Sequence, residues 1–288
     1  MRVLLTGATG FLGSHLAGAL LARGDDLHAI RRASSSFARL EAVANRIRWH
    51  DASTGADEVM RLARPAVVIH AATHYGRGGG TDADVERVNY HWPVALLGAA
   101  PAGTVFVNID TSLPPALGAY ARTKRRFAEH ARRAAGDGHT RVLNVKLESV
   151  YGPGDDPAKF QMTLIAALLR GDVVFPMTPG AQSRDYIFVA DAVEATLRLV
   201  DYAVASGDPY LAAGVGRGEA VTIRRFAETA RAAAGSATRL EFGALPYRAG
   251  ELMEARADIS LLRTLGWAGG RPLEDGLRET IARERGGA

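Results

Sequence analysis

Cysteine is absent from this 288-residue sequence. Composition therefore excludes disulfide bonds, thiolate nucleophiles and zinc sites built on cysteine, and it fits a reducing cytoplasm, where we expect the protein to work. A long hydrophobic run is also missing at the start, because the apolar segment Val3–Leu5 ends at a turn signal and is too short for a signal-peptide core or a membrane span. We expect a soluble protein that does not bind membranes.

A strong excess of charge is missing as well. The chain has 35 Lys and Arg residues against 31 Asp and Glu residues, for a formal net charge of +4. The basic residues are scattered rather than gathered in one tract, which gives nucleic-acid binding little support, whereas a phosphate-bearing small molecule would suit the local basic clusters. A hydrophobic content of 47% is ordinary for a globular protein of this length with a sizeable core.

Short apolar runs alternate with helical spacing in the first half of the chain. The runs predicted to be strands are Val3–Leu5, Leu27–Ile30, Ala66–His70, Thr104–Asn108 and Val142–Leu147. Strands that alternate with helices are typical of βα units around a parallel sheet. We therefore predict an α/β fold with a doubly wound parallel sheet of the Rossmann type.

The pattern changes after Tyr151, where a GPGDDP segment, a helix near 161–169 and a polar run with prolines follow. Such a change indicates the start of a smaller C-terminal lobe. A strand at Tyr186–Val189 and the helix after it are predicted to return to the sheet. We expect a cofactor-binding domain over 1–152, rejoined by about 186–205, and a substrate-binding lobe mainly over 153–288.

Gly7, Gly10 and Gly13 stand between the first strand and the first helix. Small residues there let the backbone approach a pyrophosphate, whose charge is stabilised by the helix N-terminus. A tight turn without a ligand is the alternative, although the position at the first βα junction favours a dinucleotide.

The end of the second strand favours NADP(H) as that dinucleotide. An NAD site places an acidic side chain there to hold the ribose hydroxyls, whereas this chain has Arg31 and Arg32, followed by serines that include Ser35. Arginines and hydroxyls suit a 2′-phosphate. Two solvated surface arginines are the alternative interpretation.

Tyr120 and Lys124 are four residues apart and would lie on one face of a helix. A phenol has a pKa of about 10, and a fixed cation beside it, together with the positive charge of an oxidised nicotinamide, would lower that value. Thr111 or Ser112, after the preceding strand, would hydrogen-bond the substrate oxygen. An ordinary exposed helix pair and a capped turn are the alternatives.

Several motifs occur in order along nearly the whole chain. They are TGATGFLGSHL (6–16), Asp51, HAAT (70–73), Asn89, the Tyr120/Lys124 pair, VYGPG (150–154) and RDYIFVADAVEA (184–195). This combination resembles the extended short-chain dehydrogenase/reductase superfamily. The segments THYGR (73–77), NIDTSLP (108–114) and YGPGDDPAKF (151–160) are similar to nucleotide-sugar 4-ketoreductases of the CDP-abequose and CDP-paratose synthase kind.

The resemblance implies NADPH-dependent reduction of a 4-keto group on a nucleotide-activated deoxysugar, by a homodimer in which Tyr120 is the acid/base group. Catalysis is assigned to Thr111, Tyr120 and Lys124. The cofactor is assigned to Gly7, Thr9, Gly10, Phe11, Leu12, Gly13, Arg31, Arg32, Ser35, Asp51, Ala52, Ala71, Ala72, Thr73, Asn89, Tyr120 and Lys124. The substrate is assigned to His74, Tyr75, Ser112, Lys159, Phe160 and Arg184, the last through its diphosphate. No cluster of residues suggests a metal site.

Other functions stay open. Ser112 and Leu113 stand where 4,6-dehydratases of the superfamily carry an Asp-Glu pair, which disfavours dehydration. A nucleotide-sugar epimerase, a reductase of another carbonyl substrate and a non-catalytic NADP(H)-binding sensor remain alternatives.

Two predicted contacts also have alternatives. An Arg184–Asp185 surface pair is the alternative to a diphosphate contact, and a turn is the alternative to a cation site at Asp155 and Asp156.

Overall fold

The computed structural model describes residues 1–286, so the last two residues of the predicted C-terminal lobe lie outside it. The chain divides into two compact units. The first unit comprises Met1–Lys146 and Ala195–Ala213, and the second comprises Leu147–Glu194 and the chain from Gly214 onwards.

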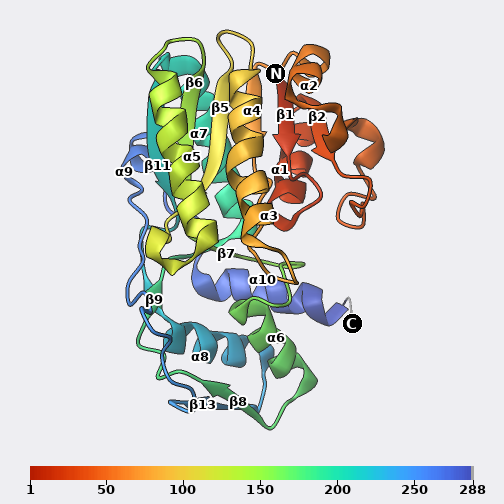
Figure 1. The fold of residues 1–288 in the computed structure, drawn as a ribbon. Helices are drawn as coiled ribbons and strands as arrows, with labels where there is room; N and C mark the ends of the chain where they lie inside the picture. Colours follow the sequence, from red (N-terminus) through yellow and green to blue (C-terminus); the bar gives the residue numbers. More distant parts are fainter. Residues whose placement is uncertain (287–288) are drawn as a thin grey trace. The chain divides into compact units, whose positions relative to one another are not determined.

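The first unit is built on a seven-stranded sheet in the order β11-β6-β5-β4-β1-β2-β3 (Figure 1). The strands are β1 (Arg2–Thr6), β2 (Asp26–Arg31), β3 (Arg48–Asp51), β4 (Val67–His70), β5 (Val105–Thr111), β6 (Arg141–Leu147) and β11 (Tyr210–Val215). Pairing is parallel between β1 and both its neighbours, between β2 and β3, and between β4 and β5. The strand order reverses at β1 and β4, so the predicted doubly wound Rossmann sheet is confirmed.

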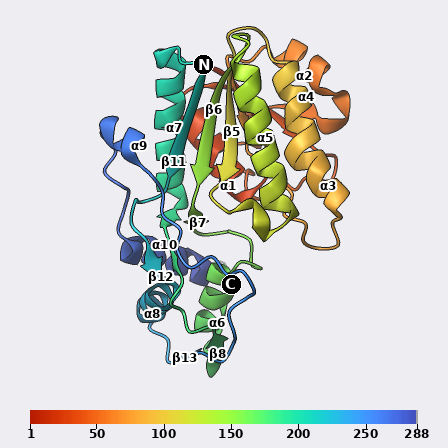
Figure 2. The same cartoon turned by 60° about the vertical axis from the view of Figure 1, so that its left-hand side comes forward.

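Helices cover both faces of this sheet; they are α1 (Phe11–Ala22), α2 (Ala56–Ala63), α3 (Asp82–Glu86), α4 (Trp92–Gly98), α5 (Ala119–Ala135) and α7 (Val189–Ser206). Figures 1 and 2 show α4 and α5 on one face and α7 on the other. On the first of these faces Phe106 of β5 packs against Phe127 of α5, with ring centroids 5.8 Å apart. Ala121, Lys124, Phe127 and Ala128 are buried on α5, and this spacing of three to four residues turns one helix face to the sheet.

Short helices connect these elements: η1 (Ala44–Arg46), η2 (Ala52–Thr54) and η4 (Pro115–Leu117) are 3-10 helices, and η3 (Arg87–His91) is a π-helix between α3 and α4. None of the helices within residues 1–286 is long and apolar enough to span a membrane.

The second unit contains α6 (Phe160–Arg170), α8 (Ile223–Ala234), α9 (Ser260–Thr264) and α10 (Leu273–Gly286). Its strands are β7 (Ser149–Tyr151), β8 (Val174–Met177), β9 (Ser183–Arg184), β10 (Tyr186–Phe188), β12 (Val221–Thr222) and β13 (Arg239–Phe242). They form three two-stranded sheets, β10-β7, β12-β9 and β13-β8. An aromatic cluster fills the core, with the rings of Tyr186 and Phe226 4.2 Å apart and Tyr151 5.8 Å from Phe226.

One expectation about the chain path is wrong. The strand at 186–188 does not enter the seven-stranded sheet but pairs with β7. The place beside β6 is taken by β11 instead, and the chain returns to the first unit at Ala195, inside α7.

Candidate active site

Three glycines shape the turn between β1 and α1. Gly7 has a φ of 73°, and a β-carbon there would lie 2.6 Å from the backbone nitrogen of Ala72, which follows β4. A β-carbon at Gly13 would lie 1.9 Å from the carbonyl oxygen of Gly7. Gly10 precedes α1, and no side chain caps the start of that helix. The turn therefore offers bare backbone and a helix N-terminus, which together fit a pyrophosphate.

This turn lies where a doubly wound sheet binds its ligand, at the carboxyl ends of the two strands where the order reverses. Other residues that the sequence assigns to the cofactor lie near this turn. They belong to the β1–α1 turn, the first turn of α1, the start of η2 and the segment after β4. They are Thr9, Phe11, Leu12, Ala52, Ala71 and Ala72. The residues present thus fit a dinucleotide along this edge.

Basic and hydroxyl groups gather at the end of β2. Arg31 is the last residue of β2 and stands in register with Asp51, the last residue of β3. Hydrogen bonds from Ser53 lower the pKa of Asp51, and the charge of Arg31 adds to this effect. Arg32 is exposed, and its backbone nitrogen donates to the Ser35 hydroxyl at 3.1 Å. Two arginines and a serine are therefore close in the chain where the sequence predicts a 2′-phosphate site, and the Arg31 guanidinium lies over the ring of Phe37, 5.3 Å from its centroid.

The predicted catalytic groups come together in the first unit. Tyr120 is the second residue of α5, and its phenol hydrogen-bonds with the hydroxyls of Thr111, at the end of β5, and Thr73. The hydroxyl of Thr111 also accepts a hydrogen bond from the backbone nitrogen of Leu113 at 3.2 Å. The ring of Tyr75 packs against Tyr120, with centroids 4.9 Å apart. Of the two candidate hydroxyls, the structure brings Thr111 to the phenol.

Lys124 is buried below Tyr120 on the same helix face. Its ammonium donates to the carbonyl oxygen of Ile109 at 2.7 Å, and Lys124 as a whole is only 2% exposed. Burial lowers the pKa of Lys124 to about 8, while the charge of Asp110 acts in the opposite direction.

The predicted lowering of the Tyr120 pKa by Lys124 and an oxidised nicotinamide together stays a prediction for the complex with the cofactor, whereas in the protein alone the pKa is shifted upwards. Burial raises the pKa of Tyr120, and the neighbouring Tyr75 and Asp110 raise it further against the hydrogen bonds from Thr111 and Thr73. Desolvation disfavours the phenolate more than its surroundings favour it. In the absence of a ligand Tyr120 is therefore a protonated phenol at neutral pH.

Asn89 holds the segment that carries Thr73. It is fully buried in the π-helix η3, where its amide donates to the carbonyl oxygen of His74 at 2.9 Å and its oxygen accepts from the backbone nitrogen of His74 at 2.8 Å. The ring of His74 in turn accepts from the backbone nitrogen of Gly76 at 3.1 Å. Asn89 therefore orders the β4–α3 loop through the backbone, a contact that its spacing in the sequence does not reveal.

The predicted substrate residues of the second unit are engaged with its own side chains. Lys159 pairs with Asp155 at 2.9 Å, and Phe160 packs against the ring of Phe226 at 6.3 Å. Arg184 pairs with Glu251 at 2.7 Å, and both side chains are less than one-fifth exposed.

The alternative of an Arg184–Asp185 surface pair is wrong, because the Asp185 carboxylate is fully buried and accepts hydrogen bonds from the backbone of Arg217, Gly218 and Ala257. Asp155 lies in a turn and is neutralised by Lys159, as the turn interpretation requires. Within residues 1–286, no group of three or more His, Asp or Glu residues is arranged to hold a metal ion.

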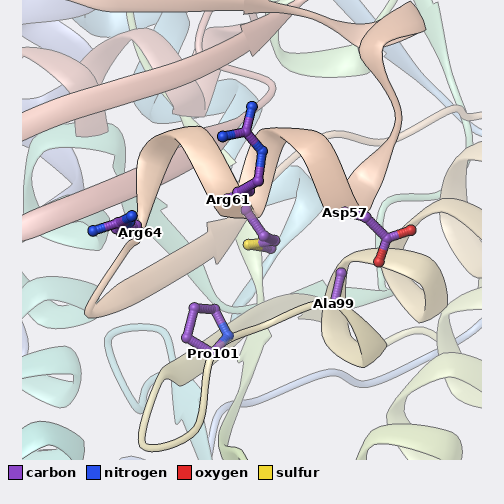
Figure 3. Close-up of a pocket in the computed structure, with 6 residues that line it drawn as sticks. Asp57, Arg61, Arg64, Ala99 and Pro101 are labelled. Atoms are coloured by element: carbon purple, nitrogen blue, oxygen red, sulfur yellow. The ribbon is translucent and has the colours of Figure 1, made fainter.

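A hollow of about 410 Å³ lies elsewhere on the first unit (Figure 3). It is lined by α2 and by the segment between α4 and β5, and Figure 3 shows Asp57 beside Ala99, while the guanidinium of Arg61 points away from Pro101. These segments precede β4 and β5, at the edge of the sheet opposite the glycine turn. None of the predicted site residues lines this hollow.

Comparisons with known proteins agree with this geometry. Residues 3–213 match the model of the NAD dependent epimerase/dehydratase family. The chain belongs to this family. Within the family, it is 30% identical to a CDP-abequose synthase from Salmonella typhimurium, over 98% of this chain and 97% of that one. It is 26% identical to a dTDP-4-dehydro-6-deoxy-D-allose reductase from Streptomyces bikiniensis, over 96% and 94% of the two chains.

A solved UDP-glucose 4-epimerase from Thermotoga maritima has the same fold, with a TM-score of 0.85 and 22% identity over 100% of this chain and 99% of that one. The protein is thus an extended short-chain dehydrogenase/reductase of the epimerase/dehydratase family.

The sequence interpretation missed three side chains around the site. Asp110 and Asn144 form part of a buried hydrogen-bond chain beside Thr111, and Glu251 pairs with Arg184. Asn144 and Glu251 lie 34 and 67 residues from their partners, so local spacing carries no signal for them. Asp110 lies inside the NIDTSLP segment and could have been found there as a carboxylate next to Thr111, the threonine that is predicted to be catalytic.

Proposed function

We propose that the protein is an NADPH-dependent reductase of a 4-keto group on a nucleotide-activated deoxysugar. When bound, the cofactor supplies the hydride that is added to the carbonyl carbon. The observation that carries the proposal is the phenol of Tyr120, which lies beside the hydroxyls of Thr111 and Thr73 and is protonated at neutral pH. Reduction of a ketone needs such a proton donor at the carbonyl oxygen.

The residues of the first unit divide the remaining work. Thr111 holds the carbonyl oxygen against the phenol, since its hydroxyl already contacts Tyr120 and is itself fixed by the Leu113 amide. Tyr120 donates the proton to that oxygen. Lys124 lies beneath the phenol as a buried cation that opposes the negative charge left on it after proton transfer.

Reduction and epimerisation start from different protonation states of Tyr120. An epimerase begins by removing a proton from a sugar hydroxyl, which requires a basic phenolate, whereas a reductase begins with the phenol protonated. Burial raises the pKa of Tyr120 in the protein without a cofactor, which is compatible with the proton donor that a reductase needs.

The preference for NADPH over NADH is supported by the end of β2. Arg31 and Arg32 offer charge-assisted hydrogen bonds to a 2′-phosphate, each worth on the order of 1.5–3 kcal/mol. The carboxylate at this edge, Asp51, lies one strand further out and is occupied by Ser53.

Arg184 is the residue that we assign to the substrate diphosphate. One nitrogen of its guanidinium donates to the Glu251 carboxylate at 2.7 Å, and another donates to the carbonyl oxygen of Ser183 at 2.7 Å. The contact with Glu251 supports the assignment, because a group that binds a carboxylate also suits a phosphate. A diphosphate would compete with Glu251 for the same guanidinium. The similarity to a CDP-abequose synthase and to a dTDP-4-dehydro-6-deoxy-D-allose reductase supports a nucleotide sugar as substrate.

The test is NADPH oxidation with CDP-, dTDP-, UDP- and GDP-linked 4-keto-6-deoxysugars. A reductase consumes one NADPH for each sugar reduced, and the loss of absorbance at the nicotinamide band should match the product formed. An epimerase would interconvert the 4-hydroxy sugars with no net oxidation of NADPH. Oxidation with simple ketones alone would instead favour a different carbonyl substrate.

A further inference from the structure

Three buried polar side chains form a hydrogen-bond chain next to the catalytic groups. Asn108 and Asp110 lie on β5, and Asn144 lies on the adjacent β6. The Asn108 amide donates to the Asn144 oxygen at 2.6 Å, and the Asn144 amide donates to Asp110 at 2.8 Å. Asn108, Asn144 and Asp110 are 0%, 1% and 6% exposed, so this hydrogen-bond chain is shielded from water.

The carboxylate sets the direction of this chain. A carboxylate only accepts hydrogen bonds, so Asn144 must turn its NH₂ group towards Asp110 and its oxygen towards Asn108. Asn108 must then donate, and its own oxygen has no hydrogen-bond partner within residues 1–286. A buried unsatisfied acceptor costs stability. The carboxylate at position 110 is thus held by a hydrogen-bond chain that leaves the Asn108 oxygen without a partner.

Asp110 connects this chain to the catalytic groups. One carboxylate oxygen accepts from the backbone nitrogen of Thr111 at 2.8 Å, while the other accepts from Asn144. The Lys124 ammonium donates to the carbonyl oxygen of Ile109, the residue before Asp110, at 2.7 Å, and the charge of Asp110 acts on both Lys124 and Tyr120 of α5. It lies on the same side of the sheet as Phe106, the face that α5 covers.

The other titratable groups around these residues are few. Tyr210 of β11 faces Asp110, and its pKa is raised by burial first and by that charge to a smaller extent, against Arg132 and Arg125 of α5. His70 of β4 faces Lys124, and burial holds its pKa well below the usual range, so it is a neutral neighbour. Asp110 is the anion whose charge supports the Lys124 ammonium.

We propose that Asp110, anchored by Asn144, is a positioning residue that holds the Thr111 backbone in place for catalysis and keeps the buried Lys124 side chain charged. The inference deepens the proposed reductase function and rests on it for its kinetic consequences. Its electrostatic part concerns the protein without ligands and can be tested without any substrate.

The electrostatic part is tested by nuclear magnetic resonance of ¹³C-labelled lysine in the cofactor-free protein. Lys124, Lys146 and Lys159 are the only lysines in the sequence, so three ε-carbon signals are followed through a pH titration. We expect Lys124 to titrate near pH 8, and at lower pH in Asp110→Asn, since that variant keeps the shape of the side chain and removes its charge. Lys146 and Lys159 serve as internal references whose titration should not move.

The positioning part is tested by comparing Asp110→Asn with Asp110→Ala. Asparagine retains an oxygen that can accept from the Thr111 amide, whereas alanine removes it. We expect kcat to fall about 10-fold in the first variant and about 100-fold in the second, because small displacements of a positioning group have effects of this size. The alkaline limb of the pH profile of kcat/KM should move to lower pH in Asp110→Asn.

Two further variants separate positioning from general destabilisation. Thr104→Val removes another buried side-chain hydrogen bond just before β5, from Thr104 to the carbonyl oxygen of Pro65, and should leave both kcat and the pH profile unchanged. Asn144→Leu leaves the carboxylate in place but removes its anchor, so we expect kcat to fall about 10-fold without the acid shift of Asp110→Asn. It also serves if Asp110→Asn does not fold.

An unchanged Lys124 titration in Asp110→Asn, or equal kcat values for Asp110→Asn, Asp110→Ala and the natural protein, would overturn the proposal. If no keto-sugar is reduced by the natural protein, the proposed function fails instead, while the lysine titration still reports on Asp110.

Discussion

Gly13→Ala should distort the glycine turn between β1 and α1, because the single added β-carbon clashes with Gly7. The added β-carbon would lie 1.9 Å from the Gly7 carbonyl oxygen and 2.6 Å from its carbonyl carbon. A carbon–oxygen contact needs about 3.3 Å, so the start of α1 and the turn must separate by about 1.4 Å. Gly7 cannot retreat, because it already packs against the Ala72 backbone. We expect a loss of about 1–3 kcal/mol in the free energy of unfolding and at least a tenfold loss in NADPH affinity, or about 1.4 kcal/mol.

Gly18→Ala is the matched control in the same helix. A β-carbon at Gly18 meets nothing within 4 Å, so alanine there should stabilise the helix by about 0.5–1 kcal/mol and leave NADPH binding unchanged. Urea unfolding followed by circular dichroism and calorimetric titration with NADPH measure the two quantities. If Gly13→Ala behaved like Gly18→Ala in both assays, the close approach of helix and turn would not be what forms the cofactor site.

Three further outcomes are expected. The Arg31→Ala/Arg32→Ala double variant should weaken NADPH binding by at least tenfold and NADH binding much less; equal losses in titrations with both would refute the 2′-phosphate assignment. Arg184→Ala should raise KM for the best nucleotide sugar strongly but barely change turnover of a small free ketone, and an unaltered KM would remove the diphosphate contact. Burial lowers the pKa values of His28 and His50, so the unfolded chain binds more protons and the free energy of unfolding should fall as the pH drops below about 6.5. In urea titrations His50→Gln should lose less unfolding free energy than the natural protein over that pH range. If the unfolding free energy of both proteins fell equally with pH, His50 would not contribute to the acid destabilisation.

The glycine turn and the Tyr120/Lys124 pair could be predicted from sequence because each depends on local geometry. Gly7, Gly10 and Gly13 are needed by one turn, and residues four apart on a helix share a face. The structure places both features as expected at the carboxyl edge of the sheet. What the sequence could not show is the balance of burial and charge around the phenol, since that depends on Asp110 and Tyr75 brought in from other elements.

The end of β5 could not be predicted from the apolar pattern of the sequence. The apolar run predicts a strand up to Asn108, yet β5 continues to Thr111. Asn108 and Asp110 break the apolar pattern but remain in the strand, where each side chain hydrogen-bonds with Asn144 of β6. Tertiary partners thus override the local signal. The Arg184–Glu251 pair has the same origin, since its members are 67 residues apart.

Turnover by Tyr120→Phe tests the central claim most directly. The variant removes only the hydroxyl that contacts Thr111 and Thr73, while the ring can still pack against Tyr75. With the best keto-sugar, the rate of NADPH oxidation should fall about 10²–10⁴-fold, and the Kd for NADPH measured on the same sample should stay unchanged. A variant that retained most of its activity with unchanged NADPH binding would show that the proton comes from another group.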